Sequence, residues 1–470
     1  MQIFNTMTRK KEDFIPQEPG VYRIYVCGPT VYNYIHIGNA RPMIVFDTLR
    51  RYLEYLGNKV LYVSNITDID DKLIKKGQAD GTTMQEVARK FEAEYIKDSE
   101  GLNVKAPTVR PRATEHIGEI IKIVKDLVES GHAYVAHNGD VYFRVKSDPG
   151  YGKLSHLNLD DLESGNRELR SQMDDDLKED PADFAVWKAA KPGEPSWNSP
   201  WGQGRPGWHI ECSVMSKKYL GEQIDIHAGG EDLIFPHHEN EIAQSEAAND
   251  KTFANYWMHN GFLNIDNKKM SKSLGNFFTV REIGEKYDLQ VLRFFMLSAH
   301  YRSPINFSAE LMEASKNGLE RIITSVEKLK ELQGKVSGDA LTETEQENQK
   351  TVNELIAKFE AAMDDDFNTA DAVSAIFELV KLANSTANEE SSKAYVDLLK
   401  ETISKLSDVL GIITERKAEV LDSEIEELIA ARQQARKEKN FARADEIRQQ
   451  LLDMGIILED TREGVKWKRA

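Results

Sequence analysis

Apolar side chains in the first part of the chain alternate between a strand pattern and a helix pattern. Residues 21–27, VYRIYVC, are β-branched and aromatic and predict a buried strand. After the Gly28-Pro29 break, apolar positions recur at helical spacing over 36–57, and a second strand-like run follows at 59–66. A strand, a helix and a strand in succession favour a parallel sheet.

Two later segments, 223–228 and 253–262, have the composition of further strands in the same sheet and flank a predicted helix at 237–248. The stretch between the two halves differs. It carries an Asn-Gly hairpin dipeptide within 133–145, and it is then rich in Gly, Pro and Trp. We therefore interpret 120–200 as an insertion in the sheet domain.

The second half of the chain is helical in pattern almost throughout, from about residue 281. Its end predicts one long helix over 423–455 and a small hairpin over 456–469. Together the patterns predict an α/β, Rossmann-like domain with an insertion, then an α-helical bundle, then a small C-terminal α+β domain.

Composition refines this picture. A chain of 470 residues and 53.4 kDa is too long for one hydrophobic core. No apolar run approaches the roughly 18 residues of a membrane span, and the start shows no secretory signal, so we expect a cytoplasmic protein without membrane contact. The net charge of -17 argues against a generic phosphate-binding surface. Residues 430–470 are the exception, with ten Lys or Arg against seven Asp or Glu.

The only two cysteines, Cys27 and Cys212, lie far apart along the chain. In a reducing compartment, a cysteine beside histidines and carboxylates is better explained as a metal ligand or a nucleophile. His237 and Glu241 are four apart on the predicted helix and share a face, so with the thiols they form a possible set of ligands for tetrahedral zinc. The alternative is two buried cysteines and a helix-capping histidine. The H-E-x-x-H motif of zinc peptidases is absent from this helix.

Two short segments suit the phosphates of a nucleotide. In HIGN, 36–39, a loop enters a helix after the first strand, glycine allows close approach, and the imidazole of His36 can donate to a phosphate oxygen. In KKMSKSLGN, 268–276, Lys269 and Lys272 can reach successive oxygens of one triphosphate and offset charge on a leaving pyrophosphate. A turn with a solvated histidine and a basic surface turn are the alternatives.

The two segments occur in the order of the two signatures of class I aminoacyl-tRNA synthetases, which they resemble. Longer matches surround them: CGPTVYNYIHIGNARP, NITDIDDKLI, PRATEHI, GRPGWHIECS and GGEDLIFPHHENEIAQSE. With these, the chain is similar over essentially its whole length to the cysteinyl-tRNA synthetase family. Two departures are visible: Asn39 replaces the second histidine of the class I signature, as is usual in this branch, and Ala228 stands where relatives commonly have glycine.

The resemblance implies a reaction and a set of site residues. Cysteine and ATP with Mg²⁺ would give cysteinyl-adenylate and pyrophosphate, and the cysteinyl group would pass to the 3′ end of tRNA(Cys). One Zn²⁺ per subunit would be held by the four residues already suspected. The family positions are Thr67, Trp208 and His227 for the cysteine pocket, Gly230 and Asp232 for adenosine, and His36, Gly38, Asn39, Lys269 and Lys272 for the phosphates.

The charge of such a zinc site raises a further expectation. Two thiolates and a carboxylate already over-neutralise a divalent ion, whereas a catalytic zinc normally keeps one position open. We therefore expect the substrate to enter as a fifth ligand, or the bond from Glu241 to be weak.

The expected domain layout has five parts: 1–119 with 201–280 as the catalytic domain, 120–200 as the insertion, 281–320 as a stem-contact region, 321–420 as the bundle and 421–470 as the anticodon-binding domain. We expect a monomer. Within the acidic run of MDDDFNTADAV, 363–373, we expect a solvated helix end. Anticodon contacts are expected in the basic tail, from Arg432, Arg436, Lys437, Lys439, Lys466 and Lys468, with Trp467 either stacked on a base or packed in the hairpin.

Two other functions are compatible with the motifs. A ligase with the same catalytic core could join cysteine to an amino-sugar, but such relatives lack the C-terminal tRNA-binding region that this chain has. A non-catalytic tRNA-binding paralogue would be expected to have lost a signature or a zinc ligand, and none is missing.

Overall fold

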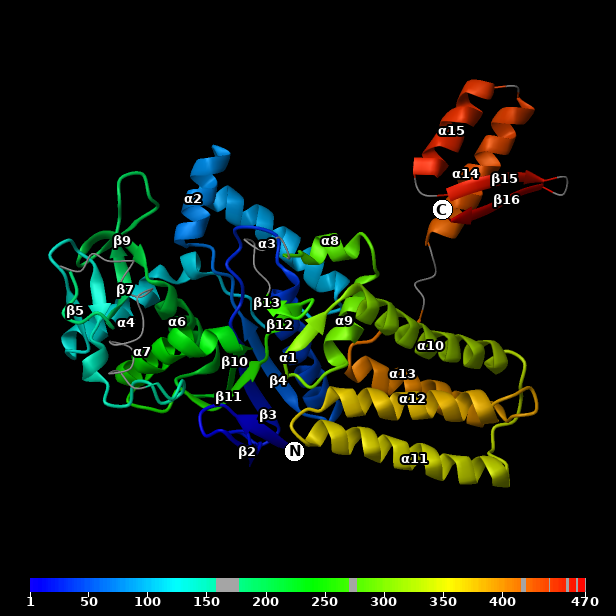
Figure 1. Cartoon of the computed structure of the whole chain (residues 1–470), viewed down its shortest axis with the longest axis horizontal. Helices are drawn as coiled ribbons and strands as arrows, with labels where there is room; N and C mark the ends of the chain where they lie inside the picture. Colours follow the sequence, from blue (N-terminus) through cyan, green and yellow to red (C-terminus); the bar gives the residue numbers. More distant parts are fainter. Residues whose placement is uncertain are drawn as a thin grey trace. The chain divides into compact units, whose positions relative to one another are not determined.

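The computed structural model describes residues 1–157, 177–269, 277–415, 420–438, 440–453, 456–461 and 464–469. It divides into two compact units, Met1–Thr414 and Glu415–Ala470, and each is considered by itself (Figure 1). Lys272 and Lys439, two of the predicted contact residues, lie outside the described residues. Across the part that is described, no helix combines the length and the apolar character needed to span a membrane.

A four-stranded parallel sheet forms the centre of the first unit, in the order β11 (Ala254–Asn260), β10 (Ile224–Gly230), β3 (Val21–Val26) and β4 (Lys59–Ser64). Every neighbouring pair is parallel, and Ile24 lies between Ile226 and Tyr62. Helix α1 (Ile37–Tyr55) crosses from β3 to β4. The predicted strand, helix, strand unit is therefore confirmed, and with it the Rossmann-like fold.

Helices precede and follow the strands of this sheet along the chain. Those that follow β4 are α2 (Asp71–Asp80), α3 (Met84–Gly101) and the short η1 (Ala113–His116). Helices α6 (Trp208–Leu220) and α7 (Glu239–Asn249) precede and follow β10, with η4 (Glu231–Leu233) and η5 (Ile234–His238) leading into α7. An N-terminal hairpin, β1 (Gln2–Asn5) and β2 (Lys10–Asp13), packs beside β11.

The insertion has its own antiparallel sheet of five strands in the order β5-β6-β7-β9-β8. The strands are β5 (Ala133–Val135), β6 (Val141–Phe143), β7 (Phe184–Ala189), β8 (Trp197–Ser199) and β9 (Gly202–Pro206), and helix α4 (Ile117–Glu129) and the short η2 (Val145–Ser147) accompany them. Trp187 is fully buried in the core between this sheet and α4. Figure 1 shows the insertion and the helical bundle on opposite sides of the central sheet.

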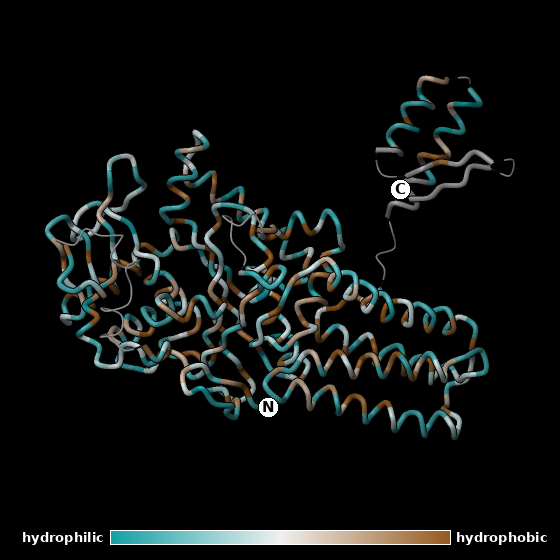
Figure 2. The backbone as a smooth tube through the Cα atoms, viewed as in Figure 1, coloured by the Kyte–Doolittle hydropathy of each residue, from teal (hydrophilic) through white to brown (hydrophobic). Residues whose placement is uncertain are grey.

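Four helices make up the bundle: α10 (Ala309–Gln333), α11 (Glu343–Asp364), α12 (Thr369–Thr386) and α13 (Lys393–Val409). Thr342 and Glu345 form a capping box that starts α11. Hydrophobic residues of the four helices face one another, as the brown stripes of Figure 2 show. Between sheet and bundle lie α8 (Val280–Gly284), α9 (Leu289–Leu297) and the small strands β12 (Leu263–Ile265), β13 (Lys268–Lys269) and β14 (Ile305–Phe307).

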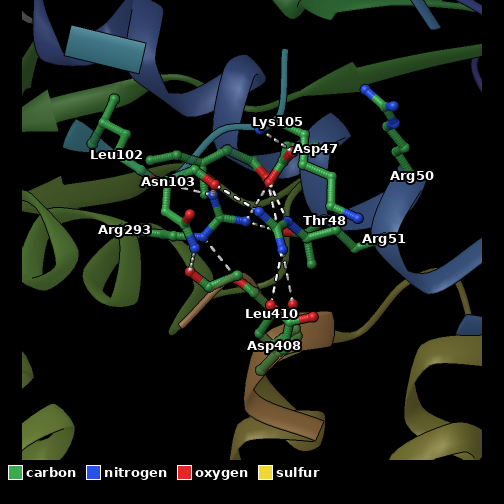
Figure 3. Close-up of polar contacts among 12 residues, drawn as sticks. Asp47, Thr48, Arg50, Arg51, Leu102, Asn103, Lys105, Arg293, Asp408 and Leu410 are labelled. Atoms are coloured by element: carbon green, nitrogen blue, oxygen red, sulfur yellow. Dashed lines mark hydrogen bonds and ion pairs between the residues drawn. The ribbon is translucent and has the colours of Figure 1, made fainter. Parts of the chain in front are cut away.

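A buried polar cluster joins α1 to α9 and to the end of α13 (Figure 3). Asp47 Oδ2 accepts from Arg51 Nε at 2.8 Å and from Arg293 Nη2 at 2.7 Å. Arg293 Nε donates to the carbonyl of Leu410, and Arg51 pairs with Asp408. The helix that begins with the HIGN motif is thus tied to the last segment of the first unit.

The second unit contains two helices, α14 (Val420–Lys437) and α15 (Phe441–Asp453), and the antiparallel hairpin of β15 (Ile456–Thr461) and β16 (Gly464–Arg469). The prediction of one long helix over 423–455 was therefore wrong. Asn440 accepts from the backbone N–H of Arg443, as a residue that starts a helix does. The break lets Ile429 of α14 pack with Ile447 and Leu451 of α15, which a straight helix could not achieve.

Candidate active site and metal cluster

A cavity of about 550 Å³ opens at the carboxyl ends of the central strands, next to the first turn of α1. It brings together seven residues that the sequence singled out: Cys27, His36, Gly38, Asn39, Trp208, Gly230 and Asp232. Carboxyl ends of parallel strands and a helix N-terminus are where α/β folds bind nucleotides. The cavity wall also includes Asn260–Leu263, which the sequence did not single out.

The start of α1 shows what the HIGN motif does structurally. His36 Nδ1 accepts from the backbone N–H of Asn39 at 3.2 Å, and Asn39 Oδ1 accepts from the backbone N–H of His36 at 3.3 Å. This is a capping box. Because Nδ1 is an acceptor, the ring proton of neutral His36 is on Nε2. The capping role of Asn39 was missed by the sequence reasoning, although the spacing of a cap and a partner three residues on is its signal.

Glycines allow tight packing at the strand ends. A Cβ on Gly28 would lie 1.6 Å from the carbonyl oxygen of Asn65, and one on Gly230 would lie 2.3 Å from Asp232 Oδ1. Only glycine therefore fits position 28, where the neighbour is backbone, whereas at position 230 the side chain of Asp232 would have to move.

Four side chains converge beside the carboxyl end of β3: Cys27, which lines the cavity, Cys212 of α6, His237 of η5 and Glu241 of α7. Cys27 Sγ lies 3.8 Å from Cys212 Sγ and 3.5 Å from Glu241 Oε1, and Cys212 Sγ lies 3.7 Å from His237 Nε2. His237 Nε2 and Glu241 Oε1 are 2.9 Å apart. The four ligand atoms that the sequence predicted to lie together do so, although Cys27 and Cys212 are on different elements.

A second set of possible metal ligands overlaps the first and shares Cys27 and Glu241 with it. Its other members are His227 and His238. Cys27 Sγ lies 3.8 Å from His227 Nε2 and 3.3 Å from His238 Nε2, and His227 Nε2 lies 2.9 Å from Glu241 Oε2. The sequence reasoning did not anticipate His238 here.

Burial and mutual attraction shift the proton affinities of this cluster strongly. Burial and the neighbouring Cys212 raise the pKa of Cys27 well above its ordinary value, whereas a hydrogen bond from Cys27 lowers the pKa of Cys212 to about 6. Burial opposes ionisation of Glu241 and His237, but their neighbours outweigh it. His227 and His237 lower the pKa of Glu241 to about 2, and Glu241 and Cys212 raise the pKa of His237 to about 10. The cluster therefore favours the thiolate of Cys212 and the carboxylate of Glu241 beside the cationic imidazole of His237.

Further histidines and a tryptophan support the cluster from behind. His209 Nδ1 lies 2.9 Å from His237 Nδ1, and the ring of Trp208 stacks on His237 with centroids 4.1 Å apart. His238 Nδ1 lies 2.8 Å from His259 Nε2, whose ring contacts Thr6. The signal for His209 was its position three residues before Cys212, on the same face of α6. Nothing in the sequence pointed to His259.

Thr67 and His227, predicted in the cysteine pocket, lie behind the cavity wall rather than on it. Thr67 is 2% exposed and donates to Glu211 Oε2 at 3.0 Å. His227 is fully buried against the rings of Tyr25 and Trp257. Trp208 differs from both, because it is 39% exposed and lines the cavity.

The segment that carries the second signature is described only at its two ends. Before it, Lys269 ends β13, where its backbone pairs with Asn264. After it, Phe277 lines the cavity and its ring contacts that of His36 edge-on, and Phe278 accepts from the backbone N–H of Ile37. The end that follows the segment is thus anchored beside the first turn of α1.

The basic residues of the second unit differ in how they are placed. Arg432 is only 4% exposed, so its side chain is not offered at the surface of this unit, while Arg436 and Lys437 are exposed. On β16, the backbones of Lys466, Trp467 and Lys468 pair with those of Glu459, Leu458 and Ile457 of β15.

Family models match most of the chain. One for the class I (C) catalytic domain of tRNA synthetases matches 13–317, one for the DALR domain matches 358–414, and one for the anticodon-binding domain of cysteinyl-tRNA ligase matches 418–467. The cysteine--tRNA ligases of Lachnospira eligens and Clostridioides difficile are 61% and 58% identical over the full length of both chains. This chain belongs to the cysteine--tRNA ligase family.

Solved structures show that the family's fold is shared more widely. Mycobacterium tuberculosis methionyl-tRNA synthetase in complex with methionyl-adenylate aligns with a TM-score of 0.58 at 15% identity, over 83% of this chain and 89% of that one. Agrobacterium radiobacter K84 agnB2 LeuRS in a ternary complex with tRNA and LeuAMS aligns with a TM-score of 0.61 at 12% identity, over 85% of each chain. At these identities the likeness concerns the fold alone.

Proposed function

We propose that this chain activates L-cysteine with ATP and Mg²⁺ to cysteinyl-adenylate and pyrophosphate, and then transfers the cysteinyl group to the 3′ end of tRNA(Cys). The proposal is supported chiefly by one cavity, which contains both a thiol of the possible metal site and a residue of the phosphate-binding motif. Cys27 of the thiol-rich cluster and His36 of the HIGN motif line the same 550 Å³ space. An amino acid held at one end therefore faces a nucleotide held at the other.

At the nucleotide end, the residues of the chain align groups and stabilise charge. His36 donates from Nε2 to a phosphate oxygen, and Gly38 and Asn39 keep the first turn of α1 open to the phosphates. Lys269 and Lys272 offset the charge that builds on the leaving pyrophosphate. Gly230 and Asp232 contact the adenosine. Alignment of the cysteine carboxylate with the α-phosphate is the main source of acceleration.

At the amino-acid end, zinc fits the set of Cys27, Cys212, His237 and Glu241. In a tetrahedral zinc site, two ligand atoms lie about 1.6 times the zinc–ligand bond length apart. This gives separations of about 3.3–3.8 Å between ligand atoms. Three of the measured separations fall in this range and the fourth is 2.9 Å. When bound, the ion acts as a Lewis acid that favours the deprotonated form of the substrate's thiol over the un-ionised hydroxyl of serine.

The surroundings favour this set over the overlapping one with His227 and His238. A metal-binding histidine normally uses its second nitrogen for a hydrogen bond that fixes the ring. His237 has such a partner in His209, whereas His227 Nδ1 is buried without a hydrogen-bond partner in the described structure. The first set also contains both thiols, the ligands that zinc prefers.

Thr67, Trp208 and His227 complete the cysteine pocket. Trp208 is the member at the cavity surface, whereas Thr67 and His227 act from behind the wall. His227 lies 2.9 Å from the carboxylate oxygen of Glu241 that faces away from His237, so it restrains a ligand. Such restraint of Glu241 accords with a weak bond from its carboxylate to the metal. Cobalt-substituted enzyme should then show absorption bands that change when cysteine is added.

The second unit binds the anticodon arm of the tRNA, and the stretch 281–320 contacts the stem. Arg436, Lys437, Lys439, Lys466, Lys468 and Trp467 remain the candidates for anticodon contacts. The match to an anticodon-binding domain over 418–467 supports this role and does not favour a cysteine:amino-sugar ligase. One zinc per chain, a monomeric state, a cytoplasmic location and the five domain boundaries stay predictions.

The decisive experiment is cysteine-dependent exchange of pyrophosphate into ATP, with serine as competitor and zinc measured on the same sample. We expect exchange with cysteine, about one zinc per chain, and discrimination against serine well above the roughly 10–200-fold that an apolar pocket achieves. Full exchange by metal-free protein, or equal exchange with serine, would contradict the proposal.

A further inference from the structure

Asp366 departs from what the sequence predicted for the acidic run between α11 and α12. A solvated helix end was expected there, yet Asp366 is fully buried. Its φ of 55° and the φ of 58° at Phe367 place two successive non-glycine residues in the left-handed region. Side chains rarely adopt this conformation, and it persists only where surrounding contacts impose it. The contacts of Asp366 therefore need an explanation.

The carboxylate of Asp366 holds the loop 300–303 that follows α9. Oδ1 accepts from the hydroxyl of Tyr301 at 2.9 Å and from the backbone N–H of Phe4 at 2.7 Å, and Oδ2 accepts from Arg302 Nε at 2.7 Å. His300 Nε2 is 3.5 Å from Oδ2. The backbone of Phe4 and the side chains of Tyr301 and Arg302 thus donate to one buried carboxylate that belongs to the bundle, far from the signatures in sequence.

This loop lies directly against the cavity wall of Asn260–Leu263. The N–H of Gly261 donates to the carbonyl of Tyr301 at 2.9 Å, and the N–H of Ile305 donates to the carbonyl of Phe262 at 3.0 Å. A Cβ on Gly261 would lie 2.6 Å from the carbonyl oxygen of Arg302. Loop and wall are packed so closely that neither can shift alone.

Arg41 ties both segments to the HIGN helix. It is fully buried on α1, two residues after the motif, and its guanidinium donates to the carbonyls of Gly261 at 2.6 Å and Phe262 at 2.9 Å. It also donates to the carbonyl of Ser303 at 2.6 Å. Burial lowers the pKa of Arg41 to about 10, so it stays charged at neutral pH.

We propose that Asp366 is a positioning residue for ATP, which acts through the loop 300–303 and Arg41 to fix the wall Asn260–Leu263 at its distance from the first turn of α1. The inference rests on the proposed function, in which this end of the cavity takes the nucleotide. The helical bundle is then part of the support of the catalytic site as well as a body for tRNA. Cysteine, at the opposite end, is held by the metal cluster and does not touch this wall.

The test compares two neighbouring aspartates in tRNA-free pyrophosphate exchange. Asp366→Asn places an N–H₂ group where an oxygen now accepts from Arg302 or Tyr301, whereas Asp365→Asn affects only an exposed pair with Lys11. We expect Asp366→Asn to raise the KM for ATP about tenfold and to leave the KM for cysteine and the zinc content unchanged. Asp365→Asn should match the wild type.

Tyr301→Phe keeps the test decisive if Asp366→Asn fails to fold, because it removes one hydrogen bond and no charge. It should raise the KM for ATP about threefold with the KM for cysteine unchanged. An unchanged KM for ATP in both variants, or equal changes in the two KM values, would overturn the inference. Wild-type enzyme without any cysteine-dependent exchange would instead remove the proposed function, so the two failures are distinct.

Discussion

The two ends of the cavity are built by different means. At the proposed amino-acid end, the ionisable side chains come from the residue after β3, from α6, from η5 and from α7, and His209 contacts the ring of His237. At the proposed nucleotide end, the capping box of His36 and Asn39 fixes the first turn of α1, and Arg41 holds the carbonyls of Gly261 and Phe262 in the wall Asn260–Leu263. One end depends on the chemistry of particular atoms, the other on the position of the main chain. Loss of a cluster ligand should therefore abolish function, whereas loss of a contact behind the wall should tune it.

Loss of a cluster thiol should have the largest effect. Cys212→Ser replaces a soft ligand by a hydroxyl beside a buried carboxylate, and we expect zinc to be lost and cysteine-dependent exchange to fall by more than about 10³-fold. Zinc analysis and exchange on the same sample measure both. Ser216→Ala, one turn further along α6 and equally buried, is the control. Active Cys212→Ser enzyme without zinc would show that the cluster does not select the substrate.

The second signature should matter for chemistry without affecting the metal. Lys272→Ala is expected to slow adenylate formation by about 10²-fold or more, while zinc stays bound. The substitution removes a positive charge that offsets the negative charge on the leaving pyrophosphate. Single-turnover formation of adenylate is the measurement. Lys268→Ala, an exposed residue of β13, should behave as wild type. Unchanged adenylate formation would exclude Lys272 from the mechanism.

Loss of a contact behind the cluster should lower its affinity for the metal. His209→Phe keeps a ring of similar shape but removes the contact with His237 Nδ1. We expect zinc affinity to fall by about tenfold, measured by competition with a chelator, and the activity of zinc-saturated enzyme to stay near that of the wild type. Wild-type affinity in this variant would mean that another group orients His237.

The smallest effect is expected at the cavity surface. Trp208→Leu removes a ring that stacks on His237, and we expect the KM for cysteine to rise about threefold to tenfold with the KM for ATP unchanged. Steady-state exchange with each substrate varied in turn measures the split. A change confined to ATP would place Trp208 at the nucleotide end and weaken the contrast drawn between the two ends.

Local patterns were enough for much of the fold. The strand, helix, strand unit, the insertion's hairpin and the helical character of the second half each follow from periodicities within a few turns of chain. The break at Asn440 was missed because the residues around it favour helix, and only the packing of Ile429 against Ile447 makes two helices better than one. Arg432 was expected at the surface and is buried. Its burial depends on which residues pack against it, and a local pattern does not contain that information.

The sequence by itself determined the chemistry of this protein, because residue types set which metals, charges and phosphates a site can hold, and the two signatures and the two cysteines are legible without a structure. Only the tertiary structure decided which groups meet. His209, His238 and His259 came to support the metal cluster, and Asp366 came to lie under the nucleotide wall, through contacts between residues far apart along the chain. Such contacts depend on how helices and sheet pack, and no local pattern encodes them.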